Sequence, residues 1–563
     1  MLRTMVRFAT TTPFLYEPPI RHVVAEVSKN LERVLILVRK CKHQSFLRRV
    51  VNRVSSADFR KVLNILEASI GDMKWLINIF DADGDEGGKV VIQHSMPPIA
   101  SNDPMLSWIW SDVATVQMGI VDDRCEAAKE LASLAKDNDR NKKIIVEEGG
   151  VPPILKLFKE STLPEVQIEA ATALYHLANN RERVRTIVNE LAIPIIVQVL
   201  GDSSMGVQIQ AASLVARMAE HDPVAQECFA RENVIRPLVT LLSFETFVDD
   251  HTGQLSKQSI HSIVKINKEI EKNSLFKSNG TRPLANSYKH MEGISRVGHY
   301  SKKERENESP EIKLELKICC ARALWMLATG SVSNSRKLTE TKGLLCLAKI
   351  VEKDQGGLQF NCLMTIMEIA IAAESNADLR CAAFKTNSPA AKAVVDQLLR
   401  VIEELDNPSL QIPAIKSIGS LARTFPARET RVIGSLVTRL SHRNLDIAAE
   451  AAIALGKFAC PENFLCMNHS KAIIEFKAIP QLMRLLRSNE HNQLHGIFLL
   501  CYLSLHAGNS ESLEQARVLT ALEGAERTVL AHHPKLRELA TMAIYHLNLY
   551  HAGVQSQRIV YLP

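Results

Sequence analysis

Apolar positions recur along the chain at helical spacing, and one pattern of them returns about every 42 residues. Copies of it, such as KELASLA at 129–135 and TALYHLA at 172–178, begin 37 to 52 residues apart, with one longer interval of 109 residues. A second motif, IIVEEGGVPPILKL at 144–157, recurs ahead of the next copies and predicts a helix end at its glycines and a helix start at its prolines. Each period therefore holds several short amphipathic helices.

Three short helices in about 42 residues are the armadillo period. One such unit cannot bury its own apolar face, so neighbouring units stack. We predict an all-α protein, an armadillo-repeat right-handed superhelical solenoid with a long concave surface. Its first block covers residues 97–245, its second block residues 313–550, and residues 551–563 form a tail. The long interval leaves 67 residues over, and polar composition predicts a flexible insertion at 246–312, either a solvated linker or a regulatory loop.

Two further amphipathic helices are predicted ahead of the repeats, at about 20–42 and 57–80. They form a helical N-terminal adaptor region at 17–80, after a divergent N-terminus at 1–16 and before a Gly-rich linker at 81–96. Two helices make half of a bundle, so they either pack on the first repeat or belong to an incomplete N-terminal domain. The basic, acid-free first 16 residues leave an organellar presequence open as an alternative.

Composition agrees with packed helices and points away from several classes of protein. The 563 residues are 46% hydrophobic and only 5% aromatic, with a net charge of +6 that is too small to indicate nucleic acid. Eleven cysteines without a Cys-x-x-Cys pair predict reduced, buried thiols in the cytosol. No uncharged apolar stretch approaches 18 residues, so no membrane span is predicted.

Candidate chemistry is scarce. The acids of DADGD at 81–85 resemble the start of an EF-hand loop, but that loop needs Gly at its sixth position and Glu at its twelfth, where this chain has Glu86 and Ile92. No metalloprotease, nucleophile-elbow or phosphate-loop motif occurs. We therefore expect no enzyme activity, no catalytic or metal-binding residue and no cofactor.

Function is then expected on the concave groove, which the third helix of each armadillo unit lines. Receptors of nuclear-localisation peptides carry a Trp and, four residues later, an Asn on that helix, and the equivalent columns here hold neither. Five cations project from these columns and favour an acidic partner, although ordinary solvated helix residues would look the same. The predicted groove residues are Lys129, His176, Arg217, Arg322, Lys416 and Lys457.

The N-terminal region holds the strongest concentration of charge. Eight cations and one acid fall between Arg39 and Lys61, with apolar residues between them. Such a segment binds anionic lipid surfaces, while a basic connection packed on the helices is the alternative. RNA is disfavoured because aromatic side chains to stack on bases are almost absent there, and no nucleic acid partner is predicted. The predicted membrane contacts are Arg39, Lys40, Lys42, Arg48, Arg49 and Arg53.

Several segments closely resemble the plant armadillo-repeat-only family. They are LYE at 15–17, the helix at 57–77, PPIASNDP at 97–104, and the stretches at 131–155, 388–400 and 417–430. The resemblance implies a scaffold without a catalytic centre. It also implies partners, namely Rho-of-plants GTPases and their GTPase-activating proteins at the plasma membrane, where active GTPase is confined to one growth site in tip-growing cells.

One departure from the family concerns the start of the chain. Family members have further helices before the LYE segment, and residues 1–13 match none of them, which indicates a late-starting gene model or a truncated paralogue. An armadillo substrate adaptor for a ubiquitin ligase, or a general signalling or defence adaptor, is the alternative function. The expected location is the cytoplasm and the periphery of the plasma membrane, with the nucleus left open.

Overall fold

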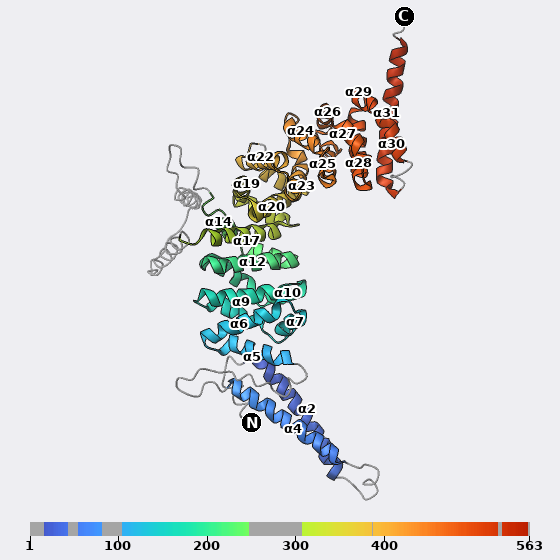
Figure 1. Cartoon of the computed structure of the whole chain (residues 1–563). Helices are drawn as coiled ribbons and strands as arrows, with labels where there is room; N and C mark the ends of the chain where they lie inside the picture. The colour runs from blue at the N-terminus through green and yellow to red at the C-terminus, as the bar shows by residue number, and fades with distance from the viewer. Residues whose placement is uncertain are drawn as a thin grey trace, which may run out of the picture.

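The protein is a curved stack of helices with a helical pair projecting from its N-terminal end (Figure 1). The computed structural model describes residues 16–42, 55–80, 104–246, 307–385, 387–526 and 532–560, with side chains left out at 77–80, 526 and 551–560. Every element in these ranges is helical, and the all-α prediction is confirmed. The predicted linker at 81–96 and nearly all of the insertion predicted at 246–312 lie outside the described residues.

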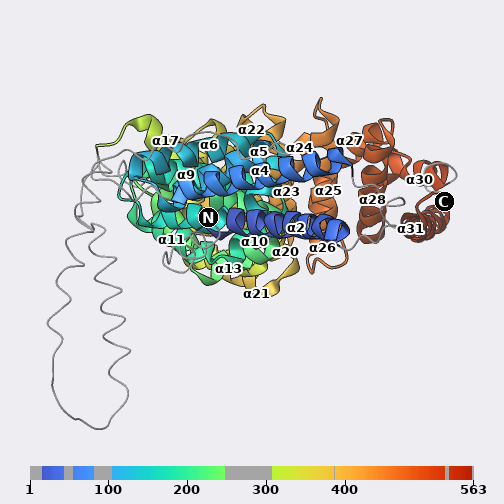
Figure 2. The same ribbon diagram turned by 90° about the horizontal axis from the view of Figure 1, so that it is seen from below.

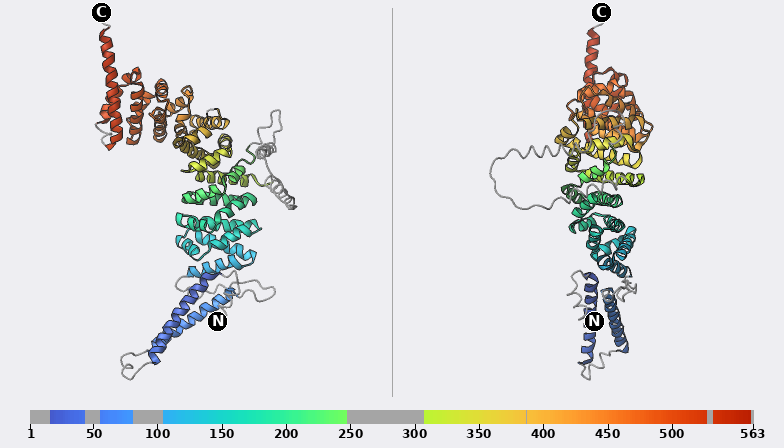
Figure 3. Two further views of the ribbon diagram at one scale, coloured as in Figure 1. Left: turned by 180° about the vertical axis from the view of Figure 1, so that it is seen from behind. Right: turned by 90° about the vertical axis from the view of Figure 1, so that its left-hand side faces the viewer.

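The chain begins with two long helices and two shorter ones before the regular units. These are α2 (Glu17–Lys42), α4 (Ser56–Phe80), α5 (Pro104–Met118) and α6 (Val121–Lys136). Both helices predicted ahead of the repeats are therefore confirmed to within a few residues. They pack on each other as a hairpin that extends away from the α5 end of the stack (Figures 2 and 3).

The remaining helices fall into units of three. The first helices are α7 (Asp139–Glu147), α10 (Arg181–Asn189), α13 (Pro223–Arg231), α18 (Val332–Glu340), α21 (Ala377–Ala383), α26 (Cys466–Glu475) and α29 (Glu511–Gln515). The second helices are α8 (Val151–Glu160), α11 (Ala192–Asp202), α14 (Ile235–Leu242), α19 (Gly343–Lys353), α22 (Pro389–Glu404), α24 (Thr430–Arg439), α27 (Ala478–Leu485) and α30 (Val518–Glu526). The third helices are α9 (Pro164–Leu177), α12 (Met205–His221), α17 (Pro310–Ala328), α20 (Gly356–Ser375), α23 (Pro408–Ser420), α25 (Leu445–Ala459), α28 (Glu490–Ala507) and α31 (Pro534–Val560).

Local chemistry explains how each unit turns. Asn side chains at 138, 180 and 376 accept hydrogen bonds from backbone N–H groups at the starts of α7, α10 and α21. Between the first and second helices the backbone enters the left-handed region, at Gly149 (φ +73°) and at the equivalent Leu191, Lys342 and Lys477 (φ 57° to 61°). Three of these four residues carry a side chain, so tertiary packing enforces a conformation that costs about 1 to 2 kcal/mol locally.

One unit departs from the pattern. Between α23 and α24 the chain makes only a 3-10 turn, η3 (Ala422–Thr424), where other units have a first helix. This explains the shortest repeat interval, 37 residues between the copies that start at Lys416 and Ile453. An open cavity of about 440 Å³ lies beside this turn, lined in part by Phe384, Leu421 and Phe425.

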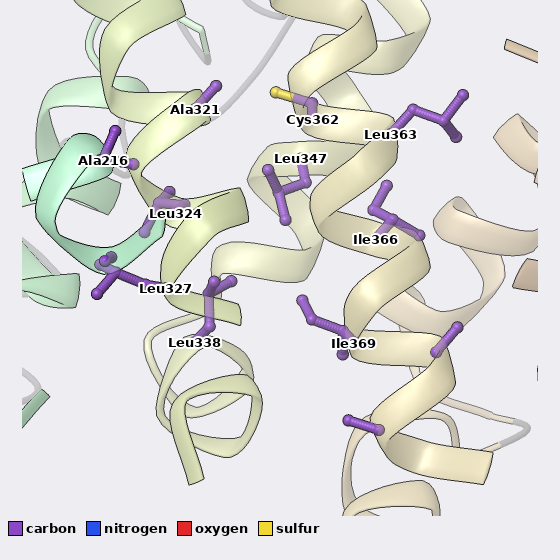
Figure 4. Packing of buried hydrophobic residues seen from close by; sticks show 14 of the residues in the cluster. Ala216, Ala321, Leu324, Leu327, Leu338, Leu347, Cys362, Leu363, Ile366 and Ile369 are labelled. Carbon is purple, nitrogen blue, oxygen red and sulfur yellow. The ribbon is translucent and has the colours of Figure 1, made fainter. Parts of the chain in front are cut away.

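The core is continuous from unit to unit. Leu324 and Leu327 of α17 face Leu347 of α19 and Ile366 and Ile369 of α20, and all five side chains are fully buried (Figure 4). Each third helix packs on the third helix of the next unit, from α9 and α12 through to α28 and α31. The preceding α6 packs on α9 in the same way. Because α12 packs directly on α17, the stack continues across the residues between them.

One helix of the described chain, α20, is long and apolar enough to cross a membrane by length and composition. About two thirds (67%) of its apolar window is buried inside the protein, between α17 and α23, as in the core helix of a solenoid. The bent pair α10 and α11, with an angle of 81° between its helices, passes the same test only if both are counted as one span. The sequence pattern had not singled out either segment.

Candidate protein-interaction groove

The stack bends between α20 and α28, and the third helices lie on the inner side of the bend (Figure 1). A bridge across three units fixes this geometry. The Nζ of Lys457 on α25 lies 2.6 Å from Oε2 of Glu374 on α20 and 3.3 Å from Oγ of Ser420 on the intervening α23. Side chains from alternate third helices can meet only where their exposed faces converge, so these faces line a concave groove.

The N-terminal section of the groove is basic and aromatic. The guanidinium of Arg217 on α12 lies 5.4 Å from the ring centre of Tyr175 on α9, and the ring of His176 contacts the same tyrosine edge-on at 5.6 Å. Burial, followed by the charges of Lys142 and Lys136, lowers the pKa of His176. The buried Nε of Arg217 has no hydrogen-bond partner among the described residues. This section is therefore suited to a group that carries negative charge.

The middle section of the groove alternates acids with bases. Arg322 on α17 lies 3.5 Å from Glu220 on α12. Burial raises the pKa values of Glu368 and Glu450, and the positive charge of Lys416 on α23 offsets part of this rise. Glu368 stands at one of the groove-lining positions that the repeat predicts from the sequence. It could therefore have indicated that the predicted cations have acidic neighbours. Lys129, at the N-terminal end, lies 3.9 Å from Glu126 on its own helix.

The C-terminal section of the groove is apolar and aromatic. Phe498 and Tyr502 on α28 contact each other edge-on with ring centres 5.5 Å apart, and His546 and Tyr550 on α31 do the same at 5.5 Å. Met542, also on α31, is 54% exposed. The groove thus changes along its length from basic through mixed charge to aromatic, and the columns of the sequence already hold Phe498, Tyr502, Met542 and His546 at this end.

The N-terminal hairpin carries the second predicted site. Arg39, Lys40 and Lys42 are exposed in the last turn of α2. The other three predicted membrane contacts, Arg48, Arg49 and Arg53, lie outside the described residues.

A single carboxylate connects the hairpin to the first units. Oε2 of Glu148, next to the end of α7, accepts a hydrogen bond from Nε1 of the buried Trp110 on α5 at 2.8 Å, and its Oε1 lies 3.4 Å from Nε2 of His22 on α2. The hydroxyl of Tyr16 donates to the backbone oxygen of Glu148 at 2.7 Å. Burial raises the pKa of Tyr16, which keeps this donor protonated.

The described residues contain no group of three or more His, Cys, Asp or Glu side chains placed to hold a metal ion. All eleven cysteines are free thiols. Four of them are buried, but Cys41 and Cys381 are exposed, which corrects the expectation of buried thiols at those two positions. Cys41 lies in the last turn of α2, and Cys381 lies in the seven-residue helix α21.

The family "Armadillo/beta-catenin-like repeat" matches residues 138–179, which coincide with the three-helix unit α7, α8 and α9. Residues 138–179 are therefore an armadillo repeat, and the other three-helix units of the chain repeat its architecture. A second match, "Domain of unknown function (DUF7792)", covers residues 1–81 and so includes both helices of the hairpin. Its description assigns no activity to them.

Curated relatives match part of the chain. The chain is 25% identical over 145 residues to importin subunit alpha-8 of Arabidopsis thaliana, covering 26% of this chain and 30% of the relative. It is 30% identical over 108 residues to importin subunit alpha-3 of the same plant, covering 19% of each. The match thus spans less than a third of these relatives.

Among solved structures, an engineered protein aligns with 78% of this chain and 99% of its own chain, at 20% identity and a TM-score of 0.49. A designed armadillo repeat protein aligns with 55% of this chain and 98% of its own, at 17% identity and a TM-score of 0.39.

Proposed function

We propose that this protein is a non-catalytic scaffold that binds protein partners in its armadillo groove and confines Rho-type GTPase signalling at the plasma membrane during polarised growth. The observation that carries the proposal is the uninterrupted stack of third helices, which presents charged and aromatic side chains on one concave face. The resemblance to plant armadillo-repeat-only proteins supports the choice of partners, Rho-of-plants GTPases and their GTPase-activating proteins.

The groove favours an acidic partner surface at its N-terminal section. Arg217 and His176 lie there, and the charges of Lys142 and Lys136 act on the histidine. An incoming carboxylate would pair with the positive charge that the guanidinium of Arg217 and the nearby lysines give to this section. The predicted residues Lys129, Arg322, Lys416 and Lys457 extend the contact along the groove, where neighbouring carboxylates let them recognise a surface of mixed charge.

We do not extend the import role named in the relatives to this chain. On the third helices, residues such as Lys129 and Thr172 stand in place of the Trp, and residues such as His176 and Arg217 in place of the Asn, that clamp basic import peptides. A basic peptide would also meet Arg217 and the lysines beside it, and like charges placed together at an interface disfavour binding.

The test is binding of a purified Rho-type GTPase, in its GTP- and GDP-bound forms, to variants of the full chain. The double variant Arg217→Glu with Lys416→Glu should bind at least about 10-fold more weakly, because it reverses two charges inside the groove. The matched control is Lys159→Glu with Arg236→Glu, which makes the same charge change on the second helices α8 and α14. Equal affinities for the two variants, with unchanged helical content, would refute groove binding.

We further propose that the end of the hairpin attracts the protein to anionic membrane. Each basic residue near an anionic leaflet contributes roughly 1 kcal/mol, so reversing Arg39, Lys40 and Lys42 should weaken binding to phosphatidylserine vesicles by at least about 100-fold. Reversal of Arg48, Arg49 and Arg53 should have a similar effect. Vesicle co-sedimentation at low and high salt measures it, and binding that survives both reversals contradicts the proposed membrane contact.

A further inference from the structure

The row of first helices is interrupted at one place in the described stack. Each first helix places a large apolar side chain in the core, exposed by 2% or less; these side chains are Ile145, Ile187, Phe229, Leu338, Leu379, Ile473 and Leu513. Between α23 and α24 the chain has only η3 and a short turn at this position. There Phe425 stacks on the buried Phe458 of α25, with ring centres 5.7 Å apart. One ring therefore closes the core, but no first helix covers it among the described residues.

The cavity beside η3 has the surroundings that a first helix has elsewhere in the stack. The first helix α18, for example, packs on the second helix of the preceding unit, α14, on its own second helix, α19, and on the first helix of an adjacent unit, α21. The open cavity of about 440 Å³ beside η3 is lined by Ala391 on α22, Arg431 on α24 and Phe384 at the end of α21. These are again a preceding second helix, the unit's own second helix and an adjacent first helix. The cavity therefore marks the place of the missing helix, which we call the η3 gap.

A second apolar feature adjoins η3 from the following unit. Phe464, in the loop before α26, is 99% exposed, and Met467 in the first turn of α26 is 55% exposed. The side chain of Asn463 ties this loop to η3, because it donates a hydrogen bond to the backbone oxygen of Ala422 at 3.4 Å. A phenylalanine ring that lies wholly in water gains no burial within the chain, whereas at an interface it contributes a large apolar area. Apolar side chains therefore adjoin η3 from the units on both sides of it.

The unpaired charges around the η3 gap are positive. Arg431 lies 2.9 Å from Asp396 and 2.5 Å from Glu429, so the two acids that line the cavity are already paired. Lys392 and Arg428 also line the cavity and are exposed, and the structure gives neither side chain an acidic partner among the described residues. Opposite charges that face each other across an interface favour association. The η3 gap is therefore suited to a ligand that combines apolar groups with negative charge.

We propose that the η3 gap is a docking site for a short amphipathic helix of a protein partner. The helix lies where a first helix of this chain would lie, with its apolar face on the cavity and on Phe464 and an acidic side chain beside Lys392 or Arg428. The first helices α7, α10, α13 and α18 are nine residues long, so a helix of about 13 Å fills the gap. A small molecule would also fit a cavity of this volume, but it would leave Phe464 in water. The site lies on the side of the first and second helices, so the proposal does not depend on the function of the groove.

The experiment selects ligands for the full chain from a phage-displayed library of random peptides of about 12 residues, enough for three helical turns. Peptides that bind the η3 gap should carry apolar residues at positions i, i+4 and i+7, with Asp or Glu between them. Lys392→Glu with Phe464→Asp should raise their dissociation constants by at least about 10-fold, and both residues are exposed, so the fold should be kept. The matched control is Lys159→Glu with Leu163→Asp, two exposed residues at and beside the end of α8, which should bind like the wild type.

Three results would overturn the proposal. The first is a selection that yields no peptide whose affinity falls in Lys392→Glu with Phe464→Asp while circular dichroism shows unchanged helical content. The second is a set of peptides that depend on these two residues but are basic or lack the helical spacing of apolar residues. The third is self-association of the wild type in sedimentation velocity that this variant abolishes, because a second copy of the chain would then occupy the η3 gap. Peptides that instead depend on Arg217 and Lys416 bind the groove, so failure of this proposal is distinguishable from failure of the groove function.

Discussion

Glu148 should control how firmly the N-terminal hairpin docks on the armadillo units. Replacing it with Ala leaves the Nε1 of Trp110, a fully buried side chain, without its acceptor. An orphaned buried donor costs about 1 to 3 kcal/mol. The contact with His22, which is 52% exposed, adds little after solvent screening, and the Tyr16 bond survives because it ends on the backbone. The rings of His22 on α2 and Trp75 on α4 lie against that of Trp110, at 5.3 and 6.2 Å between ring centres, so undocking would open Trp110 to water and the cost falls on the docked state. The docked state should therefore lose about 1 to 3 kcal/mol.

Amide hydrogen exchange resolved by mass spectrometry measures this loss. A change of this size makes local opening roughly 5- to 150-fold more frequent, and protection should fall by that factor in α2 and α4 but not in α9 or α12. Glu148→Gln keeps an acceptor oxygen and should stay close to wild type. Glu147→Ala is the matched control, since that exposed neighbour forms an ion pair with Lys143 on its own helix, at 3.7 Å. Equal protection of the hairpin in Glu148→Ala and Glu147→Ala would refute the docking role.

Three further experiments test the fold of the armadillo units. Burial raises the pKa of Asp112 to about 7, so the wild type should lose stability as the pH rises from about 4 to 7. Asp112→Asn should avoid this loss and be more stable than the wild type by up to about 4 kcal/mol at pH 8, as measured by urea unfolding. A difference in stability that does not change with pH would contradict this. A double-mutant cycle on Lys457 and Glu374 should give a coupling of about 1 kcal/mol, and zero coupling would remove their bridge as a support of the bend. A Cβ on Gly419 would lie 2.9 Å from the backbone of α25, so Gly419→Ala should lower stability by about 1 to 3 kcal/mol. Gly456 has open space around it, so Gly456→Ala should raise stability by up to about 1 kcal/mol. Thermal melting measures both changes, and two shifts of the same sign would contradict the close contact at Gly419.

The helices and their repeat could be predicted from the sequence because both depend on local pattern. Apolar spacing placed α2 and α4 to within a few residues, and the glycines at 149 and 150 with Pro152 marked the boundary between α7 and α8 correctly. The equivalent turns at Leu191, Lys342 and Lys477 lack a glycine at the left-handed position, although Pro194 and Pro480 still mark the starts of α11 and α27. At these positions the packing of a unit against its neighbours imposes the left-handed backbone. The residue type at the left-handed position does not predict that conformation.

The candidate site could be predicted only in part. The columns on the third helices place Arg217, Lys416 and Lys457 in the groove, since a regular period fixes which helix face turns inward. The partners of these cations follow from the curvature, which brings Glu374 to Lys457 across 83 positions of sequence. The contact of Glu148 with the hairpin, 132 positions from Tyr16, depends on tertiary packing in the same way.

Departures from the repeat fall outside the third helices. The missing first helix near η3 opens a cavity beside Phe425 on the side of the first and second helices, yet α23 still packs on α25. The long interval in the repeat falls between α14 and α17, and α12 still packs on α17. A third helix is buried between two neighbours of its own kind, so an insertion within it would disrupt two interfaces at once, whereas a first helix has fewer contacts to lose. The groove can therefore stay continuous while the outer edge varies, and this physical asymmetry favours the groove as the site where partners bind.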